Sequence, residues 1–202
     1  MRGRSSKLWV ASGVLVAIGL GVWLWRAAVN RPTYPTINSP RPILGKVDAA
    51  VKLEEFSDFQ CPACKSAQST VKEIVDTFGD RIAFSYRHFP LLSIHPQAFR
   101  AALASECAND QGKFWEYHDK LFEMQPAFSR DELVGYARGL QLDEPSFAAC
   151  LDSKAKSDLI REDMREGETR NVRGTPTFFV NDEAIDDWTQ LKSVLQGKLI
   201  GG

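Results

Sequence analysis

The hydrophobic and polar positions after residue 50 follow first a strand pattern and then a helix pattern. Residues 51–57 mix apolar and acidic side chains and predict a buried strand, and residues 65–78 have helical spacing. The apolar positions of that helix are Val71, Ile74, Val75 and Phe78. Gly79 suits the end of the helix, and residues 82–86 predict a second strand. Strand, helix and strand in this order predict a right-handed parallel unit.

A long, mainly helical region follows. Its predicted helices occupy residues 95–109, 111–124, a segment starting at 129, 143–151 and 155–171. Ser129 and Glu132 have the spacing of a capping box. The segment 155–171 is strongly charged, and we predict that it is largely exposed to solvent.

The pattern returns to strands near the end of the chain. Residues 174–181 predict a strand that opens at a proline, and the Asn181-Asp182 pair predicts a turn. A short returning strand is expected at 184–185. Asp187 with Gln190 is expected to cap a last helix.

The first part of the chain predicts a membrane anchor. Residues 8–25 are uncharged and mostly apolar, which is just long enough for a transmembrane helix. Arg2, Arg4 and Lys7 precede this stretch and predict that residues 1–7 stay in the cytoplasm. A cleaved signal peptide is the alternative. Residues 26–42 contain four prolines and predict an extended linker.

Composition limits the class of the remaining domain, residues 43–202. Hydrophobic residues make up 44% of the chain and predict a packed core, and the formal net charge of −1 gives no basic footprint for nucleic acid. The predicted anchor places this domain on the extracytoplasmic side of the cytoplasmic membrane, where disulfides persist.

The candidate chemistry lies at Cys61-Pro62-Ala63-Cys64. Between a strand and a helix, this spacing predicts a redox-active dithiol, and Cys61 at the helix N-terminus should have a stabilised thiolate. The alternatives are a structural disulfide or half of a zinc site. A zinc ribbon needs a second close pair, whereas Cys107 and Cys150 are isolated from each other, so we expect no metal and no cofactor.

Three segments together resemble the DsbA-like thiol:disulfide oxidoreductases. They are residues 54–64, which include the two cysteines, residues 174–181, and Gly112 to Trp115 within the helical region. The resemblance covers about residues 43–202. It implies an α/β, thioredoxin-like fold with a helical domain inserted at about 93–170, preceded here by the N-terminal transmembrane helix.

The resemblance also implies roles for individual residues. Cys61 would be the exposed nucleophile, Cys64 its buried partner, and Pro176 a cis-proline beside them. Thr175 would offer its backbone to a substrate chain. Glu55 would be a buried acid that relays a proton to Cys64; the alternative is a surface residue at a strand edge.

Two further interpretations concern neighbouring positions. We predict that Glu54 points away from Glu55 and is solvated. Cys107 and Cys150 are predicted to form a structural disulfide, because free thiols are disfavoured outside the cytoplasm. Two free buried thiols are the alternative.

The sequence thus predicts a membrane-tethered, extracytoplasmic oxidoreductase that forms disulfides in exported proteins with free thiols. The resemblance implies that a membrane redox partner reoxidises it. A reductase or isomerase remains an alternative, because Ala63 replaces the histidine of strongly oxidising relatives and Thr175 is frequent in isomerases and reductases. A binding protein or holdase without turnover is the third hypothesis.

Overall fold

The computed structural model describes residues 40–201 of the chain. The predicted anchor at 8–25, with its alternative as a signal peptide, and most of the predicted linker lie outside this part. Between residues 40 and 201, no helix is both long enough and apolar enough to span a membrane.

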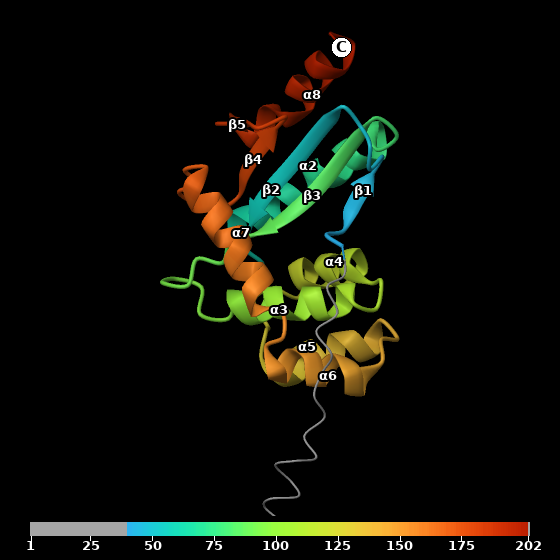
Figure 1. Ribbon diagram of the computed structural model, residues 1–202, viewed down its shortest axis with the longest axis vertical. Coiled ribbons are helices and arrows are strands. Elements are labelled where there is room, and N and C mark those ends of the chain that lie inside the picture. The colour runs from blue at the N-terminus through green and yellow to red at the C-terminus, as the bar shows by residue number, and fades with distance from the viewer. Residues whose placement is uncertain (1–39, 202) are drawn as a thin grey trace, which may run out of the picture. The chain divides into compact units, whose positions relative to one another are not determined.

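A five-stranded mixed sheet forms the centre of the fold (Figure 1). Its strands, in spatial order, are β1 (Ile43–Gly45), β3 (Ile82–His88), β2 (Val51–Ser57), β4 (Thr177–Val180) and β5 (Glu183–Ile185). β2 and β3 are parallel, and the other three pairings are antiparallel. The predicted strand-helix-strand unit is therefore confirmed, with α2 (Pro62–Phe78) as its helix and Gly79 at the C-cap.

Two helices cover one face of the sheet. Apolar side chains of α2 and α8 (Leu191–Ile200) pack against Leu53, Phe84 and Phe178 from three strands. The same face carries Glu55, because side chains alternate along a strand. A short 3₁₀ helix, η1 (Trp188–Gln190), precedes α8, and Asp187 caps it as expected.

The helical insertion lies at one end of the sheet (Figure 1), and its core is shared with Phe59, Cys61, Cys64 and Tyr86. It consists of α3 (Ala98–Asn109), α4 (Phe114–Met124), α5 (Arg130–Gly139) and α6 (Glu144–Ser153). The capping box of Ser129 and Glu132 is present at the start of α5. A disulfide joins Cys107 of α3 to Cys150 of α6, and both residues are fully buried.

The last inserted helix, α7 (Ser157–Thr169), differs from the prediction of a largely solvated helix. Ile160, Asp163 and Gly167 on one side of it are buried. This side packs on the second face of the sheet, where a Cβ on Gly167 would lie 2.7 Å from the ring of Phe89 and 3.1 Å from that of Phe56. Because many of the other positions in α7 are charged, the sequence pattern did not reveal this narrow buried stripe.

Element boundaries differ from the pattern at several ends. α3 and α4 each begin three residues later than predicted, because residues 95–97 and 111–113 form turns. α2 begins three residues earlier, because Pro62 is well suited to a first helical turn. β1 was not predicted, since three residues are too few to show a period.

The close approach at Gly167 predicts that adding a methyl group there destabilises the protein, whereas the same change at an open glycine does not. Gly167→Ala should lower the free energy of unfolding by about 1–3 kcal/mol through overpacking. Gly135→Ala is the matched control, because a Cβ there has no neighbour within 4 Å and should stabilise α5 by about 0.5–1 kcal/mol. Urea denaturation of both variants checks the difference, and equal effects would contradict the packing described for α7.

The disulfide of the insertion closes a loop with a sequence separation of 43 residues. In the chain-entropy model, a loop of this length stabilises the folded state by about 4 kcal/mol. A Cys107→Ala, Cys150→Ala double variant should lose stability of this order in urea, while the reduction potential of the Cys61–Cys64 pair stays unchanged. An unchanged free energy of unfolding would show that the bond does not hold the insertion together.

Candidate active site: the Cys61–Cys64 pair

Cys61 occupies the N-cap of α2, with extended backbone angles (φ −74°, ψ 121°). Pro62 follows in the first turn, and the amide of Lys65 donates to the carbonyl oxygen of Cys61 at 3.2 Å. Cys64 lies one turn further along the helix and faces the sheet. The local sequence therefore places both thiols at the positive end of the helix dipole.

Both cysteines are free thiols and are largely buried. Cys64 is fully buried, and Cys61 is 7% exposed rather than openly exposed as expected. Part of the cover comes from Gln125 after α4, whose side-chain amide donates to the carbonyl oxygens of Phe59 and Cys61 at 2.6 and 3.0 Å. Gln125 is 64 residues from Cys61, and no sequence pattern pointed to this contact.

The segment before β4 closes the other side of the site. The peptide bond between Thr175 and Pro176 is cis, and the sulfur of Cys61 lies 3.3 Å from the carbonyl oxygen of Thr175. The structure thus brings together the two distant motifs. The hydroxyl group of Thr175 is buried and has no hydrogen-bond partner among residues 40–201.

The two thiols differ strongly in acidity. A hydrogen bond from the Cys64 thiol lowers the pKa of Cys61 to about 5, with further contributions from Thr175 and from the amides of Ala63 and Cys64, although burial opposes the shift. Burial raises the pKa of Cys64 far above its ordinary value, and the neighbouring Cys61 and Glu55 add to this rise. At neutral pH the pair therefore holds one thiolate, on Cys61, and one thiol, on Cys64.

Glu55 lies beneath this pair on β2, and its exposed fraction is zero. Burial raises the pKa of its carboxyl group to about 7, and the negative charge of Cys61 contributes to the rise. The side chain of Gln68 in α2 donates to Oε1 of Glu55 at 3.4 Å and to the carbonyl oxygen of Cys64 at 3.2 Å. The alternative of a surface residue at a strand edge is therefore wrong.

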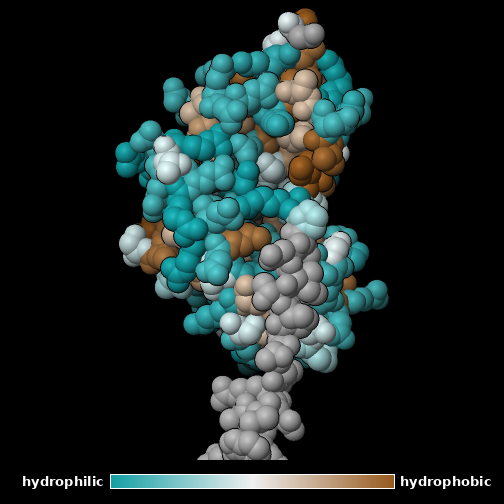
Figure 2. Space-filling model, viewed as in Figure 1, coloured by the Kyte–Doolittle hydropathy of each residue, from teal (hydrophilic) through white to brown (hydrophobic). Residues whose placement is uncertain are grey.

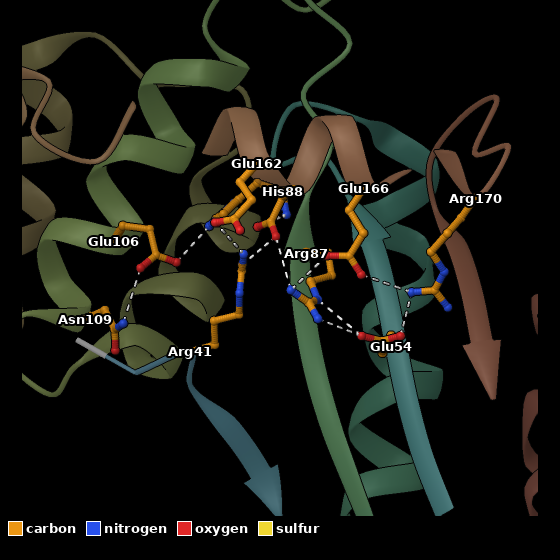
Figure 3. Close-up of polar contacts among 10 residues, drawn as sticks. Arg41, Glu54, Arg87, His88, Glu106, Asn109, Glu162, Glu166 and Arg170 are labelled. Atoms are coloured by element: carbon orange, nitrogen blue, oxygen red, sulfur yellow. Dashed lines mark hydrogen bonds and ion pairs between the residues drawn. The ribbon is translucent and has the colours of Figure 1, made fainter. Parts of the chain in front are cut away.

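Glu54 points to the opposite face of β2, as predicted, but it is not solvated. Its carboxylate binds Arg87 at 3.0 Å and Arg170 at 2.7 Å, in a cluster that includes Glu166 (Figure 3). Burial acts against ionisation, yet the hydrogen bonds from both arginines hold the pKa of Glu54 below its usual value. The sequence concealed these partners, because Arg87 and Arg170 lie 33 and 116 residues away.

Asp58 fixes the backbone on the approach to Cys61. Its carboxylate accepts from the amides of Gln60 and Leu91 at 2.7 and 2.8 Å, and it contacts Nδ1 of His95 at 2.7 Å. These contacts tie the loop after β3 to the segment just before the thiol pair. The sequence signal for this role is an acidic residue directly after a predicted strand. The structure shows that the side chain of Asp58 is buried.

The loop held by Asp58 presents apolar side chains to solvent. Leu92 is 51% exposed and Ile94 is 66% exposed, whereas most of the surface seen in Figure 2 is hydrophilic with small hydrophobic patches. Among residues 40–201, no group of three or more His, Cys, Asp or Glu residues is arranged to hold a metal ion.

Comparison with known proteins now connects this geometry to a family. The family model described as Thioredoxin matches residues 38–196. The chain belongs to the thioredoxin family. The fold is also similar to that of DsbA2 from Pseudomonas aeruginosa, which is 22% identical, with a TM-score of 0.61 over 79% of this chain and 94% of that one.

Two solved structures illustrate this likeness. BdbD from Bacillus subtilis is 28% identical, with a TM-score of 0.71 over 84% of this chain and 96% of BdbD. A thioredoxin-like oxidoreductase from Silicibacter pomeroyi is 25% identical, with a TM-score of 0.70 over 81% of this chain and 92% of that one.

Curated relatives with similar sequences are named as Na(+)/H(+) antiporters rather than as oxidoreductases. The chain is 41% identical over 139 residues to the Na(+)/H(+) antiporter NhaA 1 of Salinispora arenicola, and 34% identical over 197 residues to the antiporter NhaA of Herminiimonas arsenicoxydans. These matches cover 69% and 91% of this chain. However, the chain spans only 21% and 31% of the two relatives, so the likeness concerns one part of each antiporter.

The acidity of Cys61 predicts a titration that depends on its partner. The pH midpoint for thiolate formation at Cys61 should lie near 5, because the Cys64 thiol donates to the sulfur. Cys64→Ala should raise this midpoint, whereas Cys64→Ser should raise it less, since a hydroxyl can still donate. The ultraviolet absorbance of the thiolate, recorded against pH, measures both. A midpoint in Cys64→Ala equal to that of the wild type would exclude Cys64 as the main stabilising group.

Proposed function

We propose that this protein oxidises pairs of thiols in exported proteins by exchange with the Cys61–Cys64 disulfide. A substrate thiolate attacks the sulfur of Cys61, Cys64 leaves, and a mixed disulfide forms. The second substrate thiolate then attacks this mixed disulfide and releases the reduced enzyme. The observation that carries this proposal is the position of Cys61 at the N-cap of α2, with its sulfur 3.3 Å from the carbonyl oxygen of Thr175; the lowered pKa of Cys61, about 5, supports it.

A stable thiolate favours the reduced enzyme and therefore makes its disulfide an oxidant. At pH 7, a pKa of about 5 instead of the free value of about 8.5 favours the thiolate roughly 100-fold more. For a two-electron couple, this factor raises the reduction potential by roughly 60 mV. The gain grows as the pH rises above about 5 and is complete only above the free value of about 8.5, and it is lost below about 5, because Cys61 is then protonated in both cases.

The substrate position follows from the second motif. The carbonyl oxygen of Thr175 lies 3.3 Å from the sulfur of Cys61, so its peptide unit is close enough to pair with an extended chain bound at that sulfur. Pro176, in a cis bond to Thr175, follows this peptide unit. Leu92 and Ile94 provide nearby apolar surface for an unfolded segment.

We further propose that a single membrane-spanning helix tethers the domain to the cytoplasmic membrane. The active site then lies on the extracytoplasmic side. Support comes from the apolar segment 8–25 and from the cationic residues before it. The likeness to parts of Na(+)/H(+) antiporters also supports a position at a membrane. A membrane redox partner would then reoxidise the pair.

A reductase or isomerase is the second candidate, and two residues favour it. Ala63 supplies no charge between the cysteines, and Thr175 precedes the cis-proline. In cells, thiol trapping should find the Cys61–Cys64 pair mostly oxidised if the protein is an oxidase. A mostly reduced pair would favour the second candidate. Turnover-free binding would be indicated if a Cys61→Ser, Cys64→Ser double variant kept the cellular function.

The reduction potential provides the direct test of direction. Equilibration with glutathione should give a value closer to the roughly −120 mV of a strong oxidant than to the roughly −270 mV of a reductant. Above pH 5 the potential should fall by about 30 mV per pH unit, because only Cys64 takes up a proton on reduction. Below pH 5 the slope should approach about 59 mV. A value near that of a reductant would contradict the oxidase.

A further inference from the structure

Three polar side chains lie beneath the thiol pair on one face of the sheet. Glu55 and Ser57 are two residues apart on β2, so their side chains point to the same side. Tyr86 of β3 is directly opposite Glu55 in the parallel register and shares this face. It is the face that α2, with Cys64, covers.

This group of three, the polar cluster, is buried without being satisfied. Glu55, Ser57 and Tyr86 are 0, 1 and 3% exposed. Within residues 40–201, Oε2 of Glu55, Oγ of Ser57 and the hydroxyl of Tyr86 have no hydrogen-bond partner at ordinary distance. A buried polar group without a partner lowers the stability of the folded state. Three such groups in one place call for a functional reason.

Ser57 has the central position in the cluster. Its hydroxyl lies close enough to Glu55 and to Cys64 to lower the pKa values of both groups. It lowers the pKa of Tyr86 in the same way, against the much larger effect of burial. The hydroxyl can donate one proton and accept another, so it is suited to join a carboxyl group to a sulfur.

We propose that the hydroxyl of Ser57 carries the proton between the carboxyl group of Glu55 and the sulfur of Cys64, and that Tyr86 is a positioning residue for this transfer. The proposal deepens the function proposed above and rests on it. It assigns the path of the proton to side chains of this chain, in addition to the acid itself.

The transfer balances the exchange reaction. A bond forms between the substrate sulfur and Cys61, the Cys61–Cys64 bond breaks, and its electron pair goes to Cys64. Ser57 gives its proton to the sulfur of Cys64 and takes the proton of Glu55, which becomes a carboxylate. When Cys64 later attacks a mixed disulfide, the same proton returns to Glu55 through Ser57. The enzyme disulfide is reduced as the two substrate thiols are oxidised.

Aromatic rings on two sides hold the ring of Tyr86 in place. Its ring stacks on Phe59 with centroids 5.0 Å apart and contacts the edge of His118 at 4.9 Å. The titratable groups that face the polar cluster come from four places: Cys61 and Cys64 on α2, His88 on β3, His118 on α4, and Asp58 after β2.

The test compares Ser57→Ala, Ser57→Thr and Tyr86→Phe with the wild type. The rate at which dithiothreitol opens the oxidised Cys61–Cys64 disulfide is measured in a single turnover across pH, in H₂O and in D₂O. Ser57→Ala should slow this step on the order of a hundredfold below pH 7 and remove the solvent isotope effect, as expected for loss of general acid catalysis. Ser57→Thr retains a hydroxyl and should restore both. Tyr86→Phe should slow the step less than Ser57→Ala.

Tyr117→Phe is the matched control for removing a buried tyrosine hydroxyl. Tyr117 is fully buried in the insertion, where its hydroxyl donates to the carbonyl oxygen of Leu133 at 2.8 Å, and its loss should leave the rate and the pH profile unchanged. Urea denaturation distinguishes a loss of stability from a loss of proton transfer. Ser57→Ala and Tyr86→Phe remove unpartnered groups and should not lower the free energy of unfolding.

The relay is overturned if Ser57→Ala keeps the wild-type rate, pH profile and isotope effect, or if Ser57→Thr fails to restore them. Failure of the proposed function would look different. In that case the wild type itself would not exchange disulfides with a reduced, unfolded protein.

Discussion

The burial of the Cys64 sulfur is the constraint on which the site depends. A thiol in this position cannot ionise readily, so it stays protonated and donates to Cys61, which becomes the thiolate. The same burial requires a path for the proton whenever the disulfide opens. The acidic Cys61 follows from this buried thiol, while Glu55, whose own burial raises its pKa, and the unpartnered hydroxyls lie in the same enclosed space.

The fold supplies this burial from segments that are distant in sequence. α2 presents the pair, β2 and β3 provide the floor, and the segment before β4 closes one side. Gln125, at the end of α4, covers the other side, so the insertion also contributes to the enclosure. The insertion has a disulfide of its own, Cys107–Cys150, and its core also contains Cys61 and Cys64.

Much of this architecture could be predicted from the sequence, because its signals are local. Hydrophobic period located β2, α2 and β3, and the cap at Ser129 was visible as a short motif. What escaped prediction depends on long-range packing: the buried side of α7 around Gly167, the arginines that neutralise Glu54, and the cover over Cys61. In each case the partner is more than 30 residues away, so no pattern within a single segment could reveal it.

The contact at Arg41 has a mechanical consequence. This residue, near the start of the described chain, forms an ion pair with the buried Asp163 of α7 at 2.5 Å, while the carbonyl oxygen of Pro40 accepts from Asn109 of α3 at 3.2 Å. A pull on the chain ahead of residue 40 would therefore load α7 and α3 first. Through α7 the force would enter on the face of the sheet away from α2, and through α3 it would enter the helical insertion, whose core also holds Cys61 and Cys64.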